Sequence, residues 1–250
     1  MNLTEFNQGF PYLYETHLHT KEGSACARDT AEELVKVYKE AGYTGIMVTD
    51  HFYRGNTAVD RNCSWEDWVE AYCRGYENAK KAGDKLGLQV FFGWEESYQG
   101  TDFLVYGLGK EWLVKHPELR EVTIEEQYEL VHQAGGMVIQ AHPYREASYI
   151  PEIRLFPNAV DGVEVRNASH FGRSLREDGV SMFDVQAMEY AKKHNLPCTG
   201  GSDIHCTKLL YGGMAFPRKL EDVQDYRKAV LGREGLPMDY RAIRESMKMM

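Results

Sequence analysis

The 250-residue sequence lacks several features that would assign it to common protein classes. No apolar run approaches the roughly 18 residues that a membrane span requires, so we expect no membrane partner. The first residues lack a basic stretch followed by an apolar one, so no secretory signal is expected. Positive charge is also scarce, since the formal net charge is −9. A nucleic-acid partner usually requires a basic face, so none is expected.

Cysteine pairs of the C-x-x-C type are absent as well. The sequence has an odd number of cysteines, namely Cys26, Cys63, Cys73, Cys198 and Cys206. We interpret them as structural thiols in a reducing, cytoplasmic setting. Cys206 is the least clear of the five because it adjoins His205.

No repeat, low-complexity segment or linker rich in proline and serine interrupts the chain. With 43% hydrophobic and 27% charged residues, the sequence has enough apolar material for a sizeable core. We therefore expect a single barrel domain over residues 1–250, with a C-terminal helix and tail in residues 207–250. The oligomeric state is left open.

Apolar and amphipathic stretches alternate along most of the chain. Strands are expected at residues 12–14, 44–49, 88–94, 102–108, 137–141, 161–165 and 197–200. Helices are expected at residues 31–41, 65–86, 124–134, 182–194 and 220–231. Thr30 with Glu33 and Thr123 with Glu126 have the spacing of capping boxes, which marks the start of two helices. Strands separated by helices favour a parallel sheet.

Residues of the metal-ligand type follow the end of one strand after another. The first strand leads into Glu15-Thr16-His17-Leu18-His19-Thr20, where strand alternation places His17 and His19 on one face. The later strand ends carry His51, Glu95, His142, Asp203 and His205. In barrels of parallel strands these ends meet at one face of the molecule.

Imidazole and carboxylate donors of this kind suit zinc, manganese or iron. A single catalytic zinc takes only three or four ligands, and this set is larger. We therefore expect two to three divalent metal ions, with carboxylates as bridges between them.

These motifs resemble those of the PHP (polymerase and histidinol phosphatase) family of metal-dependent phosphoesterases. The matching stretches lie in the family's order between residue 13 and about residue 206: HLHT from His17, TDH up to His51, GWE up to Glu95, AHP around His142, VEVRN up to Asn167 and SDIH up to His205. The resemblance implies an α/β fold, a distorted (β/α)7 barrel that is TIM-barrel-like and holds up to three metals. By the same resemblance the metal ligands are His17, His19, His51, Glu95, His142, Asp203 and His205, with Glu95 as a bridge.

Two ligands of the family's pattern have no clear match here. Glu22 is the only nearby candidate after the first histidine pair, and either Asn167 or His170 follows the sixth strand. Arg145 and Arg166 come directly after strand-end motifs, where a guanidinium can hold a phosphate by two parallel hydrogen bonds. We interpret both as candidate substrate-binding residues.

The resemblance implies hydrolysis of a small phosphorylated metabolite, a phosphomonoester for which histidinol phosphate is one candidate. The expected nucleophile is a metal-bound water acting as hydroxide, with His142, Asp203 and His205 as supporting ligands. Two alternatives stay open. One is a metal hydrolase of the amidohydrolase type, although no lysine occupies a strand end here. The other is an accessory PHP domain without catalytic activity.

Overall fold

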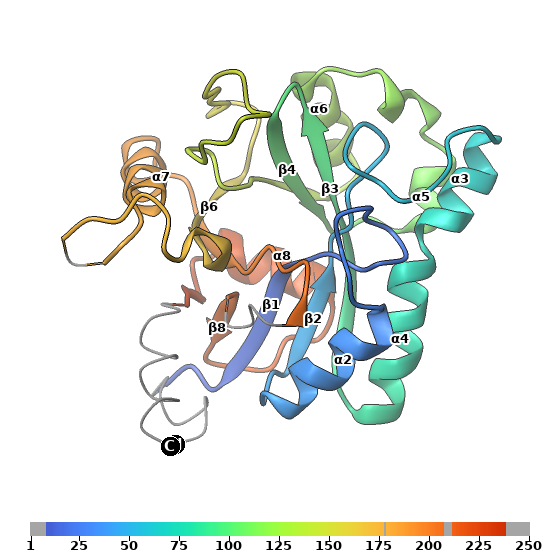
Figure 1. The fold of residues 1–250 in the computed structure, drawn as a ribbon, viewed down its shortest axis with the longest axis horizontal. Helices are drawn as coiled ribbons and strands as arrows, with labels where there is room; N and C mark the ends of the chain where they lie inside the picture. The colour runs from blue at the N-terminus through green and yellow to red at the C-terminus, as the bar shows by residue number, and fades with distance from the viewer. Residues whose placement is uncertain (1–8, 178, 208–211, 239–250) are drawn as a thin grey trace.

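The structure is a computed structural model that describes residues 9–177, 179–207 and 212–238. Within these residues, nine strands form one sheet in the order β7-β6-β5-β4-β3-β2-β1-β8-β9. The strands are β1 (Tyr12–Leu18), β2 (Gly45–Val48), β3 (Gln89–Tyr98), β4 (Thr101–Tyr106), β5 (Met137–Gln140), β6 (Gly162–Asn167), β7 (Cys198–Gly201), β8 (Met214–Phe216) and β9 (Leu236–Pro237). Figure 1 shows the sheet curling round upon itself.

The sheet is nearly closed because the end of β7 returns to the side of β1. Leu18 forms a parallel bridge with Ile204, and the Asp203 N–H donates to the His17 carbonyl at 2.9 Å. These bonds place the segment after β7 directly beside the His17-Leu18-His19 motif. The barrel that the sequence resemblance implied is therefore confirmed as the fold class.

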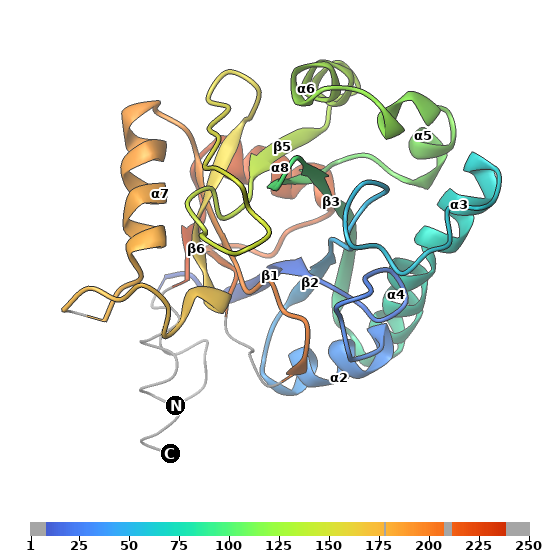
Figure 2. The same ribbon diagram turned by 45° about the horizontal axis from the view of Figure 1, so that its top comes forward.

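Helices surround the outside of the sheet, as Figures 1 and 2 show. They are α2 (Ala31–Glu40), α3 (Trp65–Tyr72), α4 (Arg74–Leu86), α5 (Lys110–Val114), α6 (Ile124–Gln133), α7 (Met182–Lys193) and α8 (Val223–Leu231), with short 3-10 turns at Pro117–Arg120 and Ala168–His170. Both expected capping boxes form, at Thr30 with Glu33 and at Thr123 with Glu126. In the described part of the chain, no helix is both long enough and apolar enough to span a bilayer.

The expectation of an all-parallel sheet is wrong. β3 and β4 form an antiparallel hairpin, and β4 also pairs antiparallel with β5. The hairpin turns at Gln99 and Gly100, whose φ angles of 51° and 86° suit the tight two-residue turns of hairpins. No helix separates these two strands in the sequence, so a parallel crossover has no segment from which to form.

Two other expectations change in detail. The single helix expected at residues 65–86 is two helices, α3 and α4, which meet at Cys73. A side chain at Gly75 would come within 2.3 Å of Thr20 Oγ1, so glycine lets α4 approach the loop after β1. The expected C-terminal tail lies partly outside the described residues, which end at Met238.

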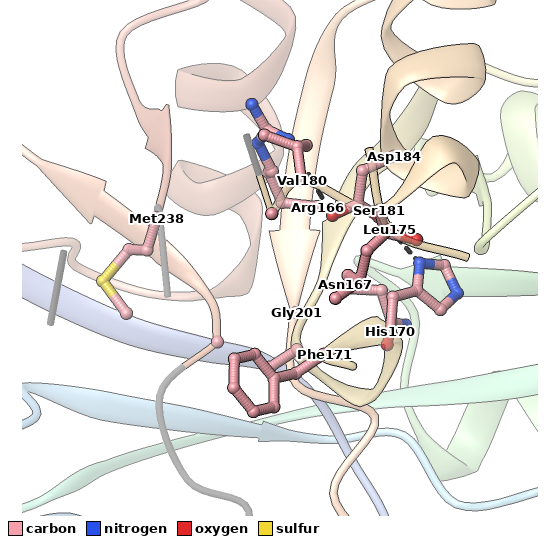
Figure 3. A pocket seen from close by; sticks show the side chains of 13 residues that line it. Arg166, Asn167, His170, Phe171, Leu175, Val180, Ser181, Asp184, Gly201 and Met238 are labelled. Carbon is pink, nitrogen blue, oxygen red and sulfur yellow. Dashed lines mark hydrogen bonds and ion pairs between the residues drawn. The ribbon is translucent and has the colours of Figure 1, made fainter. Parts of the chain in front are cut away.

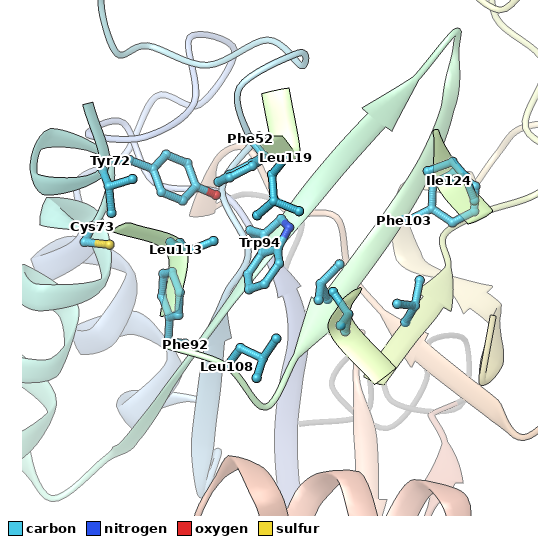
Figure 4. Packing of buried hydrophobic residues seen from close by; sticks show 14 of the residues in the cluster. Phe52, Tyr72, Cys73, Phe92, Trp94, Phe103, Leu108, Leu113, Leu119 and Ile124 are labelled. Atoms are coloured by element: carbon cyan, nitrogen blue, oxygen red, sulfur yellow. The ribbon is translucent and has the colours of Figure 1, made fainter. Parts of the chain in front are cut away.

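The core positions the site through strand alternation. Trp94 of β3 is fully buried in an aromatic cluster outside the sheet, where it lies near Phe52 with ring centroids 5.6 Å apart (Figure 4). The next residue, Glu95, must then face the barrel interior, because successive side chains of a strand point to opposite faces. Packing of Trp94 among the aromatic residues therefore fixes the direction of the Glu95 carboxylate.

Candidate metal centre

The structure brings seven of the sequence-predicted ligands into one buried cluster at the strand ends. Donor atoms lie within 4.8 Å of one another in three overlapping groups: His17 with His19 and Asp203, His17 with Glu95 and His142, and His19 with His51 and His205. The groups share His17 and His19, so the cluster is continuous. We treat it as a candidate metal centre.

Glu95 lies between the groups and directs one oxygen toward each side. Its Oε1 is 3.1 Å from His17 Nε2 and 3.3 Å from His142 Nε2. Its Oε2 is 2.7 Å from His51 Nδ1 and 3.5 Å from His19 Nε2. This is the geometry that a carboxylate needs in order to bridge two metal ions.

Asp203 divides its oxygens in a similar way. Its Oδ1 is 3.2 Å from His19 Nε2 and 3.5 Å from His205 Nδ1. Its Oδ2 instead forms an ion pair with Arg145 Nη2 at 2.5 Å. One oxygen is therefore available to the histidines, while the other is held by a guanidinium.

Hydrogen bonds on the far side of each ring fix the tautomer of the first histidine pair. His17 Nδ1 is 2.9 Å from Glu164 Oε1 and donates to it, so Nε2 is the ring nitrogen that faces the cluster. Ser24 Oγ donates to Asp50 at 2.7 Å, which leaves it as an acceptor for His19 Nδ1–H at 3.2 Å. In the neutral tautomer that these contacts favour, both rings direct Nε2 toward the cluster, as metal ligation requires.

The backbone is strained at two of the candidate ligands. His142 and Asp203 have φ angles of 27° and 54°, in the left-handed region that non-glycine residues rarely adopt. Such strain costs on the order of 1–3 kcal/mol and is concentrated at functional sites. Here it aims two side chains into the cluster from the ends of β5 and β7.

Several buried donors fit a metal ion better than they fit the protein. His17 Nε2, His19 Nε2, His51 Nδ1 and Glu95 Oε2 are buried and make no hydrogen bond of good geometry among the described residues, although each lies 2.7–3.2 Å from an imidazole or carboxylate of the cluster. Buried polar atoms are normally paired, because leaving one unpaired costs about 1–3 kcal/mol. Four such atoms that converge on one space form a donor set that suits metal cations.

The electrostatics of the cluster also favour positive charge. Burial lowers the pKa of His17, but the carboxylates of Glu164, Glu95 and Asp203 outweigh it and raise that pKa well above its ordinary value. Burial raises the pKa of Glu95, but His17 and His51 lower it well below its ordinary value. A divalent ion bound among neutral imidazoles satisfies the same carboxylates.

A cavity of about 500 Å³ opens onto the cluster. Its lining includes His142 and His205 from the cluster, and Arg145 with Tyr149 from the loop after β5. Arg145 is only 6% exposed, and its Nη2 also donates to Ser169 Oγ at 2.7 Å. The structure therefore places Arg145 at the cavity wall, although much of its guanidinium is already engaged.

His170 lies behind Arg145, outside the three donor groups. Its Nδ1 is 2.7 Å from Asp184 Oδ1, an interaction drawn in Figure 3, and its Nε2 accepts from Arg145 Nε–H at 3.3 Å. Both ring nitrogens therefore have protein partners. In this arrangement His170 orients Arg145, whereas the sequence predicted a metal ligand.

Glu22 is not brought to the cluster either. Its carboxylate accepts from the Ala31 N–H at 3.0 and 3.2 Å, at the start of α2, and from Asn78 Nδ2 at 3.2 Å. A negative charge at a helix N-terminus is stabilised by the helix dipole, which accounts for this position. The geometry does not support the expectation of a Glu22 ligand.

Arg166 and Asn167 lie away from the cavity of the cluster. Figure 3 shows both in a separate small pocket, together with Phe171 and Ser181. The nearest acidic group to Arg166 is Asp184, with Nη1 and Oδ2 3.8 Å apart. Asn167 donates through Nδ2 to Glu164 at 2.8 Å, so it supports the carboxylate that orients His17. The expectation that Arg166 faces the substrate does not fit this position.

Three residues of the site were not identified as functional from the sequence. Glu164 was quoted only as part of a motif, and its role depends on a contact across the barrel. Arg54 lines the cavity, and its Nη2 is buried without a hydrogen-bond partner in the described part of the protein. Cys26 also lines the cavity. Burial raises the pKa of its thiol, but hydrogen bonds with His205 and His51 outweigh this and lower the pKa to about 6.

Sequence comparison gives limited information on this chain. No family model matches it. An uncharacterized protein of Methanocaldococcus jannaschii is 28% identical over 165 residues, which are 62% of this chain and 82% of that protein.

Solved structures resemble the chain more completely. A two-domain protein from Bacteroides vulgatus, described as containing a predicted PHP-like metal-dependent phosphoesterase, matches with a TM-score of 0.64 and 14% identity. The match covers 93% of this chain, which spans 66% of that two-domain protein. PsfC from Pseudomonas syringae matches with a TM-score of 0.60 and 18% identity, over 96% of this chain and 99% of that one.

A further match is an amidohydrolase from Chromobacterium violaceum whose structure contains sulfate and no metal. It has a TM-score of 0.53 and 16% identity, and the match covers 90% of this chain and 97% of that one. At these identities the likeness establishes the fold. The chain therefore has the fold of PHP-like metal-dependent phosphoesterases.

Proposed function

We propose that this chain, which has the PHP-like fold, is a metal-dependent phosphoesterase that hydrolyses a small phosphate ester. The observation that carries the proposal is the convergence of buried donors, led by His17 Nε2, His19 Nε2 and Glu95 Oε2, that lack a hydrogen-bond partner among the described residues. Two to three divalent ions, of zinc, manganese or iron, account for the three donor groups. Such ions supply Lewis acidity, which makes water more acidic and neutralises charge on a phosphoryl group.

The residues of the chain hold and orient this chemistry. Glu164 and Ser24 keep protons on the Nδ1 atoms of His17 and His19, so the Nε2 lone pairs face inward. Glu95 spans the groups with its two oxygens. Because these groups are nearly or fully buried, the geometry does not have to reorganise during the reaction.

Two arginines support a phosphorylated substrate. Arg145 and Arg54 both line the cavity beside the cluster. Arg54 Nε and Nη1 are bonded to Glu96 and to the Val122 carbonyl, which leaves the buried Nη2–H without a partner in the described chain. A guanidinium at the wall of a cavity in an acidic protein suits a phosphate oxygen.

The test is a hydrolysis assay on the full chain, stripped with chelator and then loaded with zinc, manganese or iron. We expect the loaded protein to cleave an aryl phosphomonoester and the stripped protein to lack this activity. Histidinol phosphate and other phosphorylated metabolites form the second substrate panel. Asp203→Ala serves as the inactive control, and its circular dichroism should match that of the wild type.

An amidohydrolase activity is the second candidate, because one of the similar structures is an amidohydrolase. A panel of amides and lactones separates the two reactions. Cleavage of an amide or lactone without cleavage of any phosphate ester would refute the phosphoesterase assignment. If the metal-loaded protein cleaved none of these substrates, the accessory-domain alternative would be favoured, despite the seven donors that the chain retains.

A further inference from the structure

Strands β1 and β7 meet at a seam of the barrel that a side chain helps to close. β7 is at one edge of the sheet order, and the segment after it joins β1 through the isolated bridge between Leu18 and Ile204. In a ladder of paired strands, the backbone N–H groups would find carbonyl partners across this seam, and buried N–H groups need such partners. Here the Glu15 carboxylate accepts from two of them.

Glu15 is fully buried, and its two oxygens have different partners. Oε1 accepts from the His17 N–H at 2.8 Å and from the Ser202 N–H at 2.9 Å. Oε2 accepts from the Tyr38 hydroxyl of α2 at 2.8 Å. These hydrogen bonds compensate the burial of a carboxylate, which is otherwise unfavourable. One oxygen therefore joins β1 to the residue after β7, and the other ties this junction to a helix outside the sheet.

The two backbones approach one another closely at this junction. A side chain at Gly201 would come within 2.4 Å of His17 Cβ, so glycine is required where β7 ends. Asp203 follows with a φ angle of 54°, a strained conformation that persists only where the surrounding structure holds it. Glu15 holds the preceding residue, Ser202, and the His17 carbonyl accepts from the Asp203 N–H at 2.9 Å.

The same junction carries one donor group of the candidate metal centre. His17, His19 and Asp203 bring ligand atoms within 4.8 Å of one another. Asp203 Oδ1 is 3.6 Å from His17 Nε2 and 3.2 Å from His19 Nε2. In the described sheet β1 pairs with β2 and β8, and β7 pairs with β6. The donor distances between β1 and the end of β7 therefore depend on the bonds across the seam.

We propose that Glu15 is a positioning residue of the metal centre, an inference that rests on the metal-dependent function proposed above. Its carboxylate holds the His17 backbone against Ser202, which sets the spacing of the donor atoms in this group. The role requires an acceptor oxygen at the correct reach and does not require the negative charge. Glu15 was not identified as functional from the sequence because its partner across the seam lies 187 positions away.

Three substitutions at Glu15 separate acceptor reach from charge. Glu15→Gln keeps Oε1 as an acceptor for both N–H groups, so its affinity for cobalt(II) should stay close to that of the wild type. Glu15→Asp keeps the charge but is one methylene shorter, so it should not reach Ser202 and should bind cobalt more weakly. Glu15→Ala removes the acceptor, and we expect its cobalt affinity to fall at least about tenfold.

Two readouts that do not depend on activity measure these effects. The full chain is stripped with chelator and titrated with cobalt(II), whose visible absorption reports the ligand geometry, while elemental analysis gives the bound metal. Hydrogen exchange of the metal-free chain reports the seam itself. The amides of His17 and Ser202 should exchange slowly in the wild type and in Glu15→Gln, and quickly in Glu15→Ala. Circular dichroism checks that each variant is folded.

Two controls separate positioning from a general loss of stability. Val131→Ala removes core volume from α6, away from the seam, so it should lower the free energy of unfolding and leave the cobalt affinity and spectrum unchanged. Tyr38→Phe removes the bond to Oε2 and leaves both bonds to Oε1, so its cobalt affinity should fall less than that of Glu15→Ala. If Glu15→Ala fails to fold, the contrast between Glu15→Asp and Glu15→Gln decides the question.

The outcomes separate this inference from the proposed function. Wild-type cobalt affinity, spectrum and amide exchange in folded Glu15→Ala would overturn the positioning role and leave the phosphoesterase proposal intact. Weak cobalt binding in Glu15→Gln with normal binding in Glu15→Asp would overturn it too, because charge would then matter and reach would not. An equal loss of cobalt affinity in Val131→Ala would overturn it as well. A wild-type chain that binds no cobalt at all would overturn both proposals.

Discussion

The candidate metal centre has two unlike flanks that meet at Glu95. On the arginine flank, His142 lies near Arg145, which His170 and Asp184 hold in place. On the thiol flank, His51 and His205 line the cavity together with Cys26. The arginine flank is closed, since the Arg145 side chain is only 7% exposed. The thiol flank is more open, with His205 31% exposed.

The two flanks therefore differ in the groups that balance the negative charge of the carboxylates. Arg145 is a permanent cation whose Nη2 is 2.5 Å from Asp203 Oδ2, so it neutralises part of that carboxylate. On the thiol flank the carboxylates instead face imidazoles, with His51 Nδ1 2.7 Å from Glu95 Oε2 and His205 Nδ1 3.5 Å from Asp203 Oδ1. We therefore expect substitutions on the two flanks to change metal content and kcat/KM in different ways.

The largest effect is expected for Glu95→Gln, because Glu95 serves both flanks. An amide cannot replace a bridging carboxylate, so metal should be lost on both sides. Several kcal/mol of transition-state stabilisation would be lost with it, or about 10³-fold in kcat/KM. Steady-state kinetics and elemental analysis of the same preparation measure both effects. A folded variant with wild-type metal content would contradict the bridging role.

A smaller effect, limited to the arginine flank, is expected for Arg145→Ala. It removes one charge-assisted contact with the substrate or with Asp203, which corresponds to about 1–3 kcal/mol in kcat/KM. Arg145→Lys should recover only part of this, because a point charge cannot form the paired hydrogen bonds of a guanidinium. Metal content should change little.

Arg166→Ala is the matched control for the arginine flank. Arg166 also follows a strand-end motif, but it lines a different pocket. Its kcat/KM should equal that of the wild type. Equal losses in Arg145→Ala and Arg166→Ala would remove the distinction drawn between them.

The smallest effect on activity is expected for Glu22→Ala, because Glu22 lies on neither flank of the metal centre. It removes an acceptor at the start of α2, so the free energy of unfolding should fall by about 0.3–1 kcal/mol. Chemical denaturation measures this change. Metal content and activity should stay at wild-type values, and loss of one metal equivalent would restore Glu22 as a ligand.

The candidate ligands at strand ends were predictable from the sequence, because the alternation and length of each apolar run indicate where a strand ends and which side chains share a face. His17 and His19 share a strand face by alternation, and His142 follows a short apolar run typical of a buried strand. The seven ligands that the resemblance implied are the seven residues that form the donor groups. Whether they bind metal stays a prediction, as do the cytoplasmic setting and the single domain.

Contacts made across the barrel were not predictable in this way. Glu164 contacts His17 from 147 positions away in the sequence, and Cys26 lines a cavity with His51 and His205 only in the folded chain. The antiparallel β3–β4 hairpin was missed because a Gln-Gly turn is a weaker signal than Asn-Gly. The contacts of His170 were not predictable for a similar reason, since its partners Arg145 and Asp184 come from other segments.

The central claim is that the buried donors at the strand ends hold metal. The most direct test is elemental analysis of the full chain purified without chelator, repeated after incubation with zinc, manganese or iron. We predict two to three divalent ions per chain, one for each donor group that is filled. A metal content near zero that none of the three metals restores in folded protein would contradict the account.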